Sequence, residues 1–290
     1  MQIDLSNLPP PEVIETLSFE VILDAMRADL IARFPQIEPT LALESTVVSK
    51  VLQVAAYREV LIRARINDAA ISLLLARAFG GNLDNLAANF NVKRLAVTPA
   101  VGGAPAILED DERLRRRVIL AIEAYSVAGP SGAYIYHALS AVPELRDASA
   151  ISVEPGVVTV TLMKSLLDPV PTADQRERVV KALSDETVRP LTDVVIVAAP
   201  EIVDTDITAE LMIYPGPDGN VIADRARARL AEFINKVGFL GRDLRRSALF
   251  SGLHVEGVQS VNLIQPAVDL IGSPRRAIKV GAINLSITGG

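Results

Sequence analysis

The first hundred residues carry apolar side chains at the spacing of amphipathic helices. In residues 12–33 the apolar positions recur every three or four residues, at Phe19, Ile22, Leu23, Met26 and Leu30. This spacing places them on one face of a helix. Pro35 and Pro39 follow this pattern, and proline disrupts the backbone hydrogen bonds of a helix, so we expect the helix to end at about residue 33.

A much longer helix is predicted for residues 44–79, with a length of roughly 50 Å at about 1.5 Å per residue. Its seam alternates spacings of four and three residues, as in a coiled coil, and includes Val48, Leu52, Ala55, Glu59, Ile62, Ile66, Ala69 and Leu73. A second apolar row, Val47, Val51, Val54 and Leu61, runs beside it. Two rows indicate a helix that is packed on two sides. Either it forms an intramolecular bundle with the helix at 12–33, or part of it pairs with another chain.

The candidate interface residues are the large or apolar members of this seam. They are Val48, Leu52, Ala55, Ile62, Ile66 and Leu73. Gly80 and Gly81 are expected to end the long helix, because glycine accepts the positive φ of a helix C-terminus. Asn82 is then a plausible N-cap for a short helix at 83–90, and residues 95–108 are interpreted as a linker or loosely structured arm.

Charged residues mark the start of the next helix. Four acidic residues at 109–112 precede Arg113, Arg115, Arg116 and Arg117, an order that suits the helix dipole. The arginine cluster could bind phosphate, but the adjacent acids favour a solvated or interface-facing helix start. Ser131 is expected to cap a further helix that ends near residue 141.

From residue 148 onward the pattern changes to short runs of β-branched residues. Residues 151–153 and 157–162 flank Pro155-Gly156, which predicts a hairpin. The remaining expected elements are a helix at 172–183, strands at 193–198 and 202–213, helices at 221–237 and 247–253, and strands at 258–264 and 277–287. The fold class is therefore α+β: a helical N-terminal region with a long heptad-bearing helix, followed by two small α+β sandwich lobes. The expected domains are 1–108, 109–200 and 201–290.

Composition narrows the functional classes. The 290 residues carry 29 basic and 35 acidic side chains, so the net charge is −6, and this balance argues against nucleic acid as the main ligand. There is no cysteine, which removes disulfides, thiolate nucleophiles and sulfur-ligated zinc. Neither a membrane helix nor a secretory signal is expected. A mean hydropathy of +0.31 is high, and it suggests apolar surface reserved for partners.

Candidate chemistry is sparse. The two histidines, His137 and His254, have no nucleophile motif nearby and are interpreted as hydrogen-bonded structural residues. Asp204 and Asp206 could form a metal pair, but the alternation of their strand places both on a solvated outer face. The glycine-rich turns at 129–132 and 215–219 lack the phosphate-binding lysine. No catalytic, cofactor-binding or metal-binding residue is therefore predicted, and a carboxylate-dependent hydrolase is retained only as an unfavoured alternative.

Several short stretches, in order along nearly the whole chain, resemble one known family. They are ISLLLARAFGG at 71–81, NLDNLA at 82–87, DERLRRR at 111–117, AGPSGAY at 128–134, VRPLTD at 188–193, YPGPD at 214–218, LGRD at 240–243, SAL at 247–249 and HVEGVQSV at 254–261. Together they resemble the baseplate J-like proteins of contractile-tailed phages and related injection systems. That family offers no catalytic residues to carry over.

The resemblance implies a structural wedge component of a tail baseplate. Two copies would be clamped by a helical partner, a baseplate I-like tail protein, and six wedges would close into a ring around the central hub. A sheath-initiator or lysozyme-like baseplate protein would be a further neighbour. The implied location is the virion tail, after assembly in the cytoplasm of the bacterial host. A cellular injection or secretion-system scaffold remains the alternative, because it would share the long heptad-bearing helix and the apolar surface.

Overall fold

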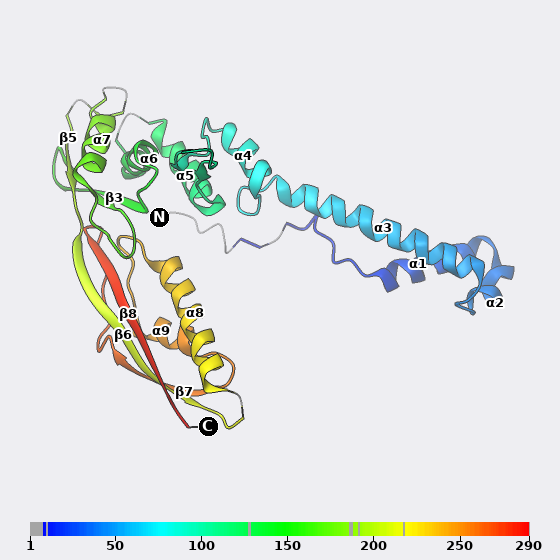
Figure 1. The fold of residues 1–290 in the computed structure, drawn as a ribbon. Helices are drawn as coiled ribbons and strands as arrows, with labels where there is room; N and C mark the ends of the chain where they lie inside the picture. Colours follow the sequence, from blue (N-terminus) through cyan, green and yellow to red (C-terminus); the bar gives the residue numbers. More distant parts are fainter. Residues whose placement is uncertain are drawn as a thin grey trace. The chain divides into compact units, whose positions relative to one another are not determined.

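A computed structural model describes residues 8–9, 11–126, 129–185, 188–190, 192–216 and 218–289 (Figure 1). The chain divides into two compact units, Met1–Lys93 and Arg94–Gly290. Four of the predicted features, the motifs at 128–134, 188–193 and 214–218 and the turn at 215–219, include residues that lie outside the described ranges.

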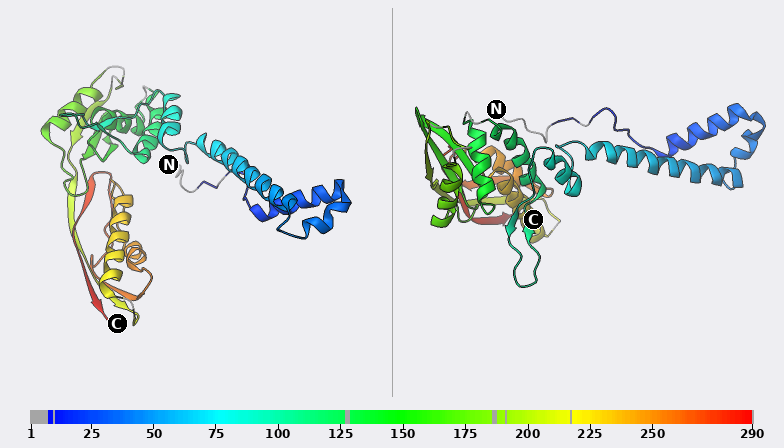
Figure 2. Two further views of the ribbon diagram at one scale, coloured as in Figure 1. Left: turned by 45° about the vertical axis from the view of Figure 1, so that its right-hand side comes forward. Right: turned by 90° about the horizontal axis from the view of Figure 1, so that it is seen from above.

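The first unit is built on a pair of antiparallel helices. Helix α1 (Phe19–Arg33) is followed by the short helices η2 (Pro35–Ile37) and α2 (Glu38–Leu41), and the chain then returns in α3 (Val47–Ser72). Helices α1 and α3 lie side by side in every view (Figures 1 and 2). Their shared core consists of Ile22, Leu23 and Ala56, with Phe19, Met26, Leu52 and Val60 packed against it.

The first helix begins later than the predicted residue 12. Ser18 is its N-cap, and the side-chain oxygen of Ser18 accepts a hydrogen bond from the Val21 N–H. Upstream, the Glu15 N–H donates to Asn67 Oδ1 at 3.1 Å, and Asn67 Nδ2 donates to the Glu15 carbonyl at 2.8 Å. Because a side chain of α3 satisfies the backbone of Glu15, this segment does not need helical hydrogen bonds.

The long helix is shorter than predicted. Thr46 caps its start, but it ends at Ser72, and residues 73–79 form turns. Gly80, at a φ of +53°, does not terminate α3 as expected but opens α4 (Gly80–Ala88), so Asn82 lies inside α4 and is not its cap. The turn allows Ala78 and Leu83 to be fully buried, which a continuous exposed helix would not achieve.

The second unit begins with a small hairpin. Strands β1 (Ala96–Thr98) and β2 (Ile107–Leu108) pair antiparallel, so the expectation of a loose arm at 95–108 was wrong. Helix α5 (Asp111–Ala124) is capped by Asp110, whose carboxylate accepts from the Arg113 N–H at 2.8 Å. Helix α6 (Ser131–Ala141) begins where predicted, but its N-cap is Pro130.

The first sheet has the order β3-β4-β5. Strands β3 (Asp147–Glu154) and β4 (Val157–Met163) form the predicted antiparallel hairpin, and β5 (Val194–Ala198) joins β4 in parallel after α7 (Ala173–Leu183). Helices α6 and α7 cover one face of the sheet. The largest buried side chains of this core are Tyr134, Leu139, Leu145, Leu162 and Leu183.

The second sheet has the order β7-β6-β8, with β6 (Glu201–Ile213) antiparallel to β7 (Val258–Gln265) and parallel to β8 (Arg276–Thr288). Helices α8 (Gly219–Val237) and α9 (Arg246–Leu253) supply Leu230, Leu249 and Leu253 to its core. The α+β class with a helical N-terminal region is confirmed. The domain boundaries at residues 108 and 200 stay a prediction.

The two histidines differ from expectation, because within the described residues neither imidazole makes a hydrogen bond. His137 lies on α6, where its ring packs edge-on against Tyr136 at 5.3 Å, and His254 is exposed after α9. Partial burial lowers the pKa of His137 from its ordinary 6.5, with the charge of Asp185 acting in the opposite direction.

This lowered pKa predicts a pH-dependent stability. Below about pH 6.5 the unfolded chain binds the proton of residue 137 more readily than the folded chain, so stability is full above this pH and falls as the pH drops. Replacing His137 by asparagine should reduce the dependence of the urea unfolding midpoint on pH between pH 7 and 5.5. Equal slopes for wild type and His137→Asn would contradict the prediction.

Candidate interaction surfaces

The predicted seam of α3 is divided between the interior of the helix pair and the surface. Leu52 packs against the core shared with α1, and Val48 is partly buried. The other four candidate residues are exposed: Ala55, Ile62 (62%), Ile66 (54%) and Leu73 (72%). With Val51 (61%) and Ala69 they form one row along the helix, which we call the open stripe: Val51, Ala55, Ile62, Ile66, Ala69 and Leu73.

Helix geometry explains why the seam leaves α1. A heptad repeat advances 3.5 residues per turn and a straight α-helix 3.6, so the seam drifts by about 20° per heptad around the helix. Leu52, near the start, still borders the α1 contact, whereas Ile62 and Ile66 have rotated away from it. In addition, α1 has 15 residues and α3 has 26, so the second half of α3 extends beyond the start of α1.

A polar clamp holds the segment before α1 against this second half. Arg63 contacts Glu15 and Glu59, each at 2.7 Å, and these two carboxylates raise the pKa of its guanidinium. The clamp thus accounts for Glu59, the one charged member of the seam. The three side chains of the clamp are largely solvent-accessible, so the clamp positions the segment before α1 more than it stabilises the fold.

Two further arginines of α3 have no such partner. Arg58 and Arg65 are exposed, and within the described part of the chain neither makes a hydrogen bond or an ion pair. Both lie along the outer border of the open stripe. An apolar row beside unpaired arginines is a surface suited to an acidic, apolar partner helix.

Comparison with known proteins gives this geometry its context. The family model for the baseplate J-like N-terminal domain matches residues 44–101, and that for the baseplate J-like central domain matches residues 126–199. Baseplate protein J of Escherichia phage P2 is 41% identical over 278 residues, which cover 93% of this chain and 92% of that protein. The chain belongs to the baseplate J-like family.

A solved structure also resembles this baseplate J-like chain, more distantly. It is the cryo-EM structure of the anti-feeding prophage (AFP) baseplate, with 18% identity and a TM-score of 0.41. The match covers 62% of this chain and 43% of that chain, so the matched part spans less than half the length of that structural relative.

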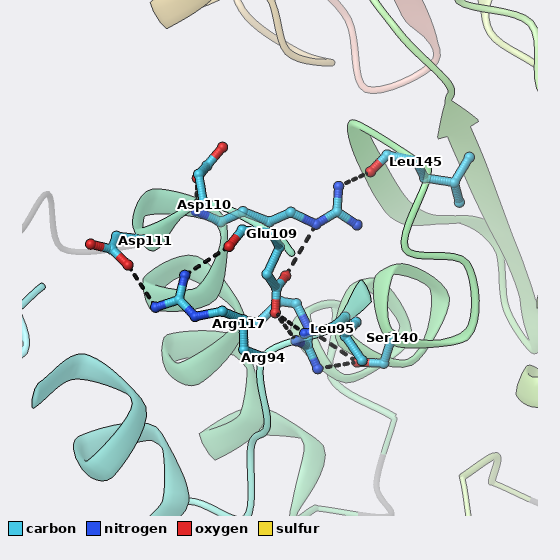
Figure 3. Close-up of polar contacts among 9 residues, drawn as sticks. Arg94, Leu95, Glu109, Asp110, Asp111, Arg117, Ser140 and Leu145 are labelled. Atoms are coloured by element: carbon cyan, nitrogen blue, oxygen red, sulfur yellow. Dashed lines mark hydrogen bonds and ion pairs between the residues drawn. The ribbon is translucent and has the colours of Figure 1, made fainter. Parts of the chain in front are cut away.

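In the second unit of the baseplate J-like chain, a buried polar network joins the β1–β2 hairpin to α5 (Figure 3). The Glu109 side chain is fully buried, and it contacts Arg117 at 2.5 Å and Arg113 at 3.2 Å and accepts from the Leu95 N–H at 3.0 Å. Arg94 donates to the Glu109 carbonyl and contacts Asp111. Arg113 and Arg117 of the arginine cluster noted in the sequence therefore form ion pairs within the chain.

A second network connects the lobe of the β3-β4-β5 sheet to the lobe of the β7-β6-β8 sheet. Arg116 and the Leu240 N–H both contact the Asp147 carboxylate, which is almost fully buried at the start of β3. Phe239, in the loop after α8, lies beneath the guanidinium groups of Arg146 at 4.8 Å and Arg116 at 5.2 Å. Cation–π contacts and a buried carboxylate thus tie the first lobe to the second.

One apolar surface in the first sheet was not predicted from the sequence. The face opposite α6 and α7 exposes Val153, Val194 and Ile196. The run VVIVA at 194–198 contained the signal, because it is apolar at both alternating positions although helices cover only one face of this sheet.

The two aspartates considered for a metal pair make contacts within the chain. Asp204 and Asp206 lie on the exposed face of β6, as predicted; Asp204 pairs with Lys279 at 3.5 Å, and Asp206 accepts from the Ala282 N–H at 2.8 Å. Across the described ranges, no cluster of three or more acidic or histidine side chains could hold a metal. Within the same ranges, no helix has the length and apolarity to cross a membrane.

Proposed function

We propose that this chain is a structural component of a contractile tail baseplate wedge. In each wedge it assembles with a second copy of itself and a helical, baseplate I-like partner, and six wedges form a ring around the central hub. It works there without catalysis, in a virion tail that is assembled in the cytoplasm of the host. Family membership supports the baseplate assignment, and the relative from phage P2 bears that name.

The single observation that carries the wedge assignment is the open stripe of α3. Four large apolar side chains of one row are more than half exposed, although the other face of the helix is already packed against α1. Burying one such side chain contributes about 1.5–3 kcal/mol, which favours association over exposure to water. A helix that is apolar on two sides is what a bundle with other chains requires.

The experiment is to delete the coding sequence in cells that produce the particle and to examine the particles by electron microscopy. We expect tails without baseplates, and re-expression of the chain should restore sixfold rings that contain two copies per wedge. Images also distinguish a phage tail attached to a DNA-filled head from a free injection particle. Intact baseplates in the absence of this chain would overturn the proposal.

A further inference from the structure

Helix α1 carries an exposed row that matches the open stripe. Val21, Ala25, Ala28 and Ala32 follow spacings of four, three and four residues, and all are exposed, Val21 to 68%. Each residue advances about 100° around a helix, so this row lies roughly 145° from the direction that faces α3. By the same measure, the open stripe lies roughly 110° from the direction that faces α1, in the same rotational sense.

Because the two helices are antiparallel, angular offsets in the same rotational sense place both rows on the same side of the helix pair. The helix pair therefore presents two apolar rows on one side, which together form its apolar face: small residues on α1 and larger ones on α3. The exposed side chain of Asp29 lies between them. Small residues allow close helix approach, and larger residues fill the space beside them. This face can pack on an identical face of a second copy, to give a four-helix arrangement with twofold symmetry.

The charges along the two helices differ in sign. Residues 12–33 carry five acidic and two basic side chains, whereas α3 carries four basic and two acidic ones. Of the basic residues on α3, Arg63 is used by its own chain, and the unpaired Arg58 and Arg65 border the apolar face. Stacking α3 on α3 of the second copy would bring these arginines together, and stacking α1 on α3 would bring opposite charges together.

The positions of the residues along the helix axes agree with stacking α1 of one copy on α3 of the other. Ile22 and Leu23 of α1 share a core with Ala56 of α3, so a residue of α1 lies level with the α3 residue whose number brings their sum to about 80. A twofold axis parallel to the helices preserves these positions. It places Ala25 of one copy near Ala55 of the other, and Arg58 near the second copy's Glu20 and Asp24.

We infer that the occupant of the Val51–Ala55–Ile62 part of the open stripe is α1 of a second copy, stacked with the twofold axis parallel to the helices. The inference rests on the proposed function, because it assigns the contact between the two copies of one wedge. The remaining part, Ile66 to Leu73, extends beyond α1 of the second copy and stays available for a third helix.

The absence of cysteine allows a direct test by disulfide cross-linking. Two differently tagged copies of the full chain, one with Ala25→Cys and one with Ala55→Cys, are co-expressed with the baseplate partners and oxidised in assembled particles. We expect a covalent dimer that carries both tags, and no such dimer when Tyr57→Cys, on the opposite flank of α3, replaces Ala55→Cys. A reversed charge, Arg58→Glu, should weaken the dimer about tenfold, and adding Asp24→Lys should recover most of the loss.

The other outcomes separate the inference from the proposed function. Dimers formed between two Ala25→Cys copies would show the opposite stacking and overturn the inference while two copies per wedge remain. Cross-links from Ala55→Cys only to a different protein would give the stripe another occupant, and would also overturn it. Assembled particles that lack the chain altogether would overturn the proposed function itself.

Discussion

Replacing Ile62 by aspartate is expected to abolish assembly while both units of the chain stay folded. Ile62 is 62% exposed, so the substitution removes little packing within the chain itself. In the proposed wedge the same side chain would be buried, and a buried unpaired carboxylate costs several kcal/mol in addition to the lost apolar contact. We expect association to weaken by at least about 100-fold, which corresponds to about 2.7 kcal/mol.

Leu52→Asp is the informative comparison, because the sequence placed Leu52 and Ile62 on the same seam. Leu52 packs against the core of α1 and α3, so its replacement should unfold this helix pair as well as prevent assembly. Tyr57→Asp, on the opposite flank of α3, serves as the exposed control and should assemble normally. Circular dichroism and proteolysis report folding, and co-purification with the second copy and the partner reports assembly. Normal baseplates from Ile62→Asp would show that the open stripe is not an assembly surface.

Replacing Glu109 by glutamine is expected to destabilise the second unit by about 3–5 kcal/mol. Glu109 is fully buried and its carboxylate balances Arg117, itself almost fully buried, and Arg113. Burial lowers the pKa of Arg113, and Glu109 opposes that effect, so removal of the carboxylate leaves two poorly solvated cations without compensation. Urea unfolding of the full chain, followed by circular dichroism, measures the change.

Glu112→Gln is the matched control for this network. Its carboxylate also pairs with an arginine, Arg115, at 2.6 Å, but its side chain is 85% exposed, so the loss should stay below about 1 kcal/mol. The double variant Glu109→Gln, Arg117→Met should recover part of the stability, because an apolar side chain replaces the uncompensated cation. A loss below 1 kcal/mol for Glu109→Gln alone would refute this account of the network.

Elements that depend on local patterns could be predicted from the sequence. The strong alternation of β6 and the apolar periodicity of α8 set their type and extent, and their observed bounds differ from the predicted ones by at most two residues. The Thr172 side chain and Gln175 form a reciprocal capping box at the start of α7, a feature that local sequence alone encodes. The family resemblance of the whole chain was also visible at this level and is confirmed.

Elements that depend on distant contacts could not be predicted in this way. The late start of α1 follows from Asn67, which lies 52 residues away and satisfies the backbone of Glu15. The early end of α3 accompanies burial of Ala78 and Leu83, which no helical periodicity could show. The β1–β2 hairpin lacked a strong turn or strand pattern, and its base is fixed by the Glu109 network.

The sequence by itself determined that α3 is apolar on more than one side, because the heptad spacing and the second row are local properties of the chain. Only the tertiary structure decided which members of the seam face α1 and which face outward. That division depends on the angle at which α1 packs, on the shorter length of α1, and on the slow rotation of a 3.5-residue repeat around a 3.6-residue helix. It assigns Leu52 to the interior and Ile62, Ile66 and Leu73 to the surface.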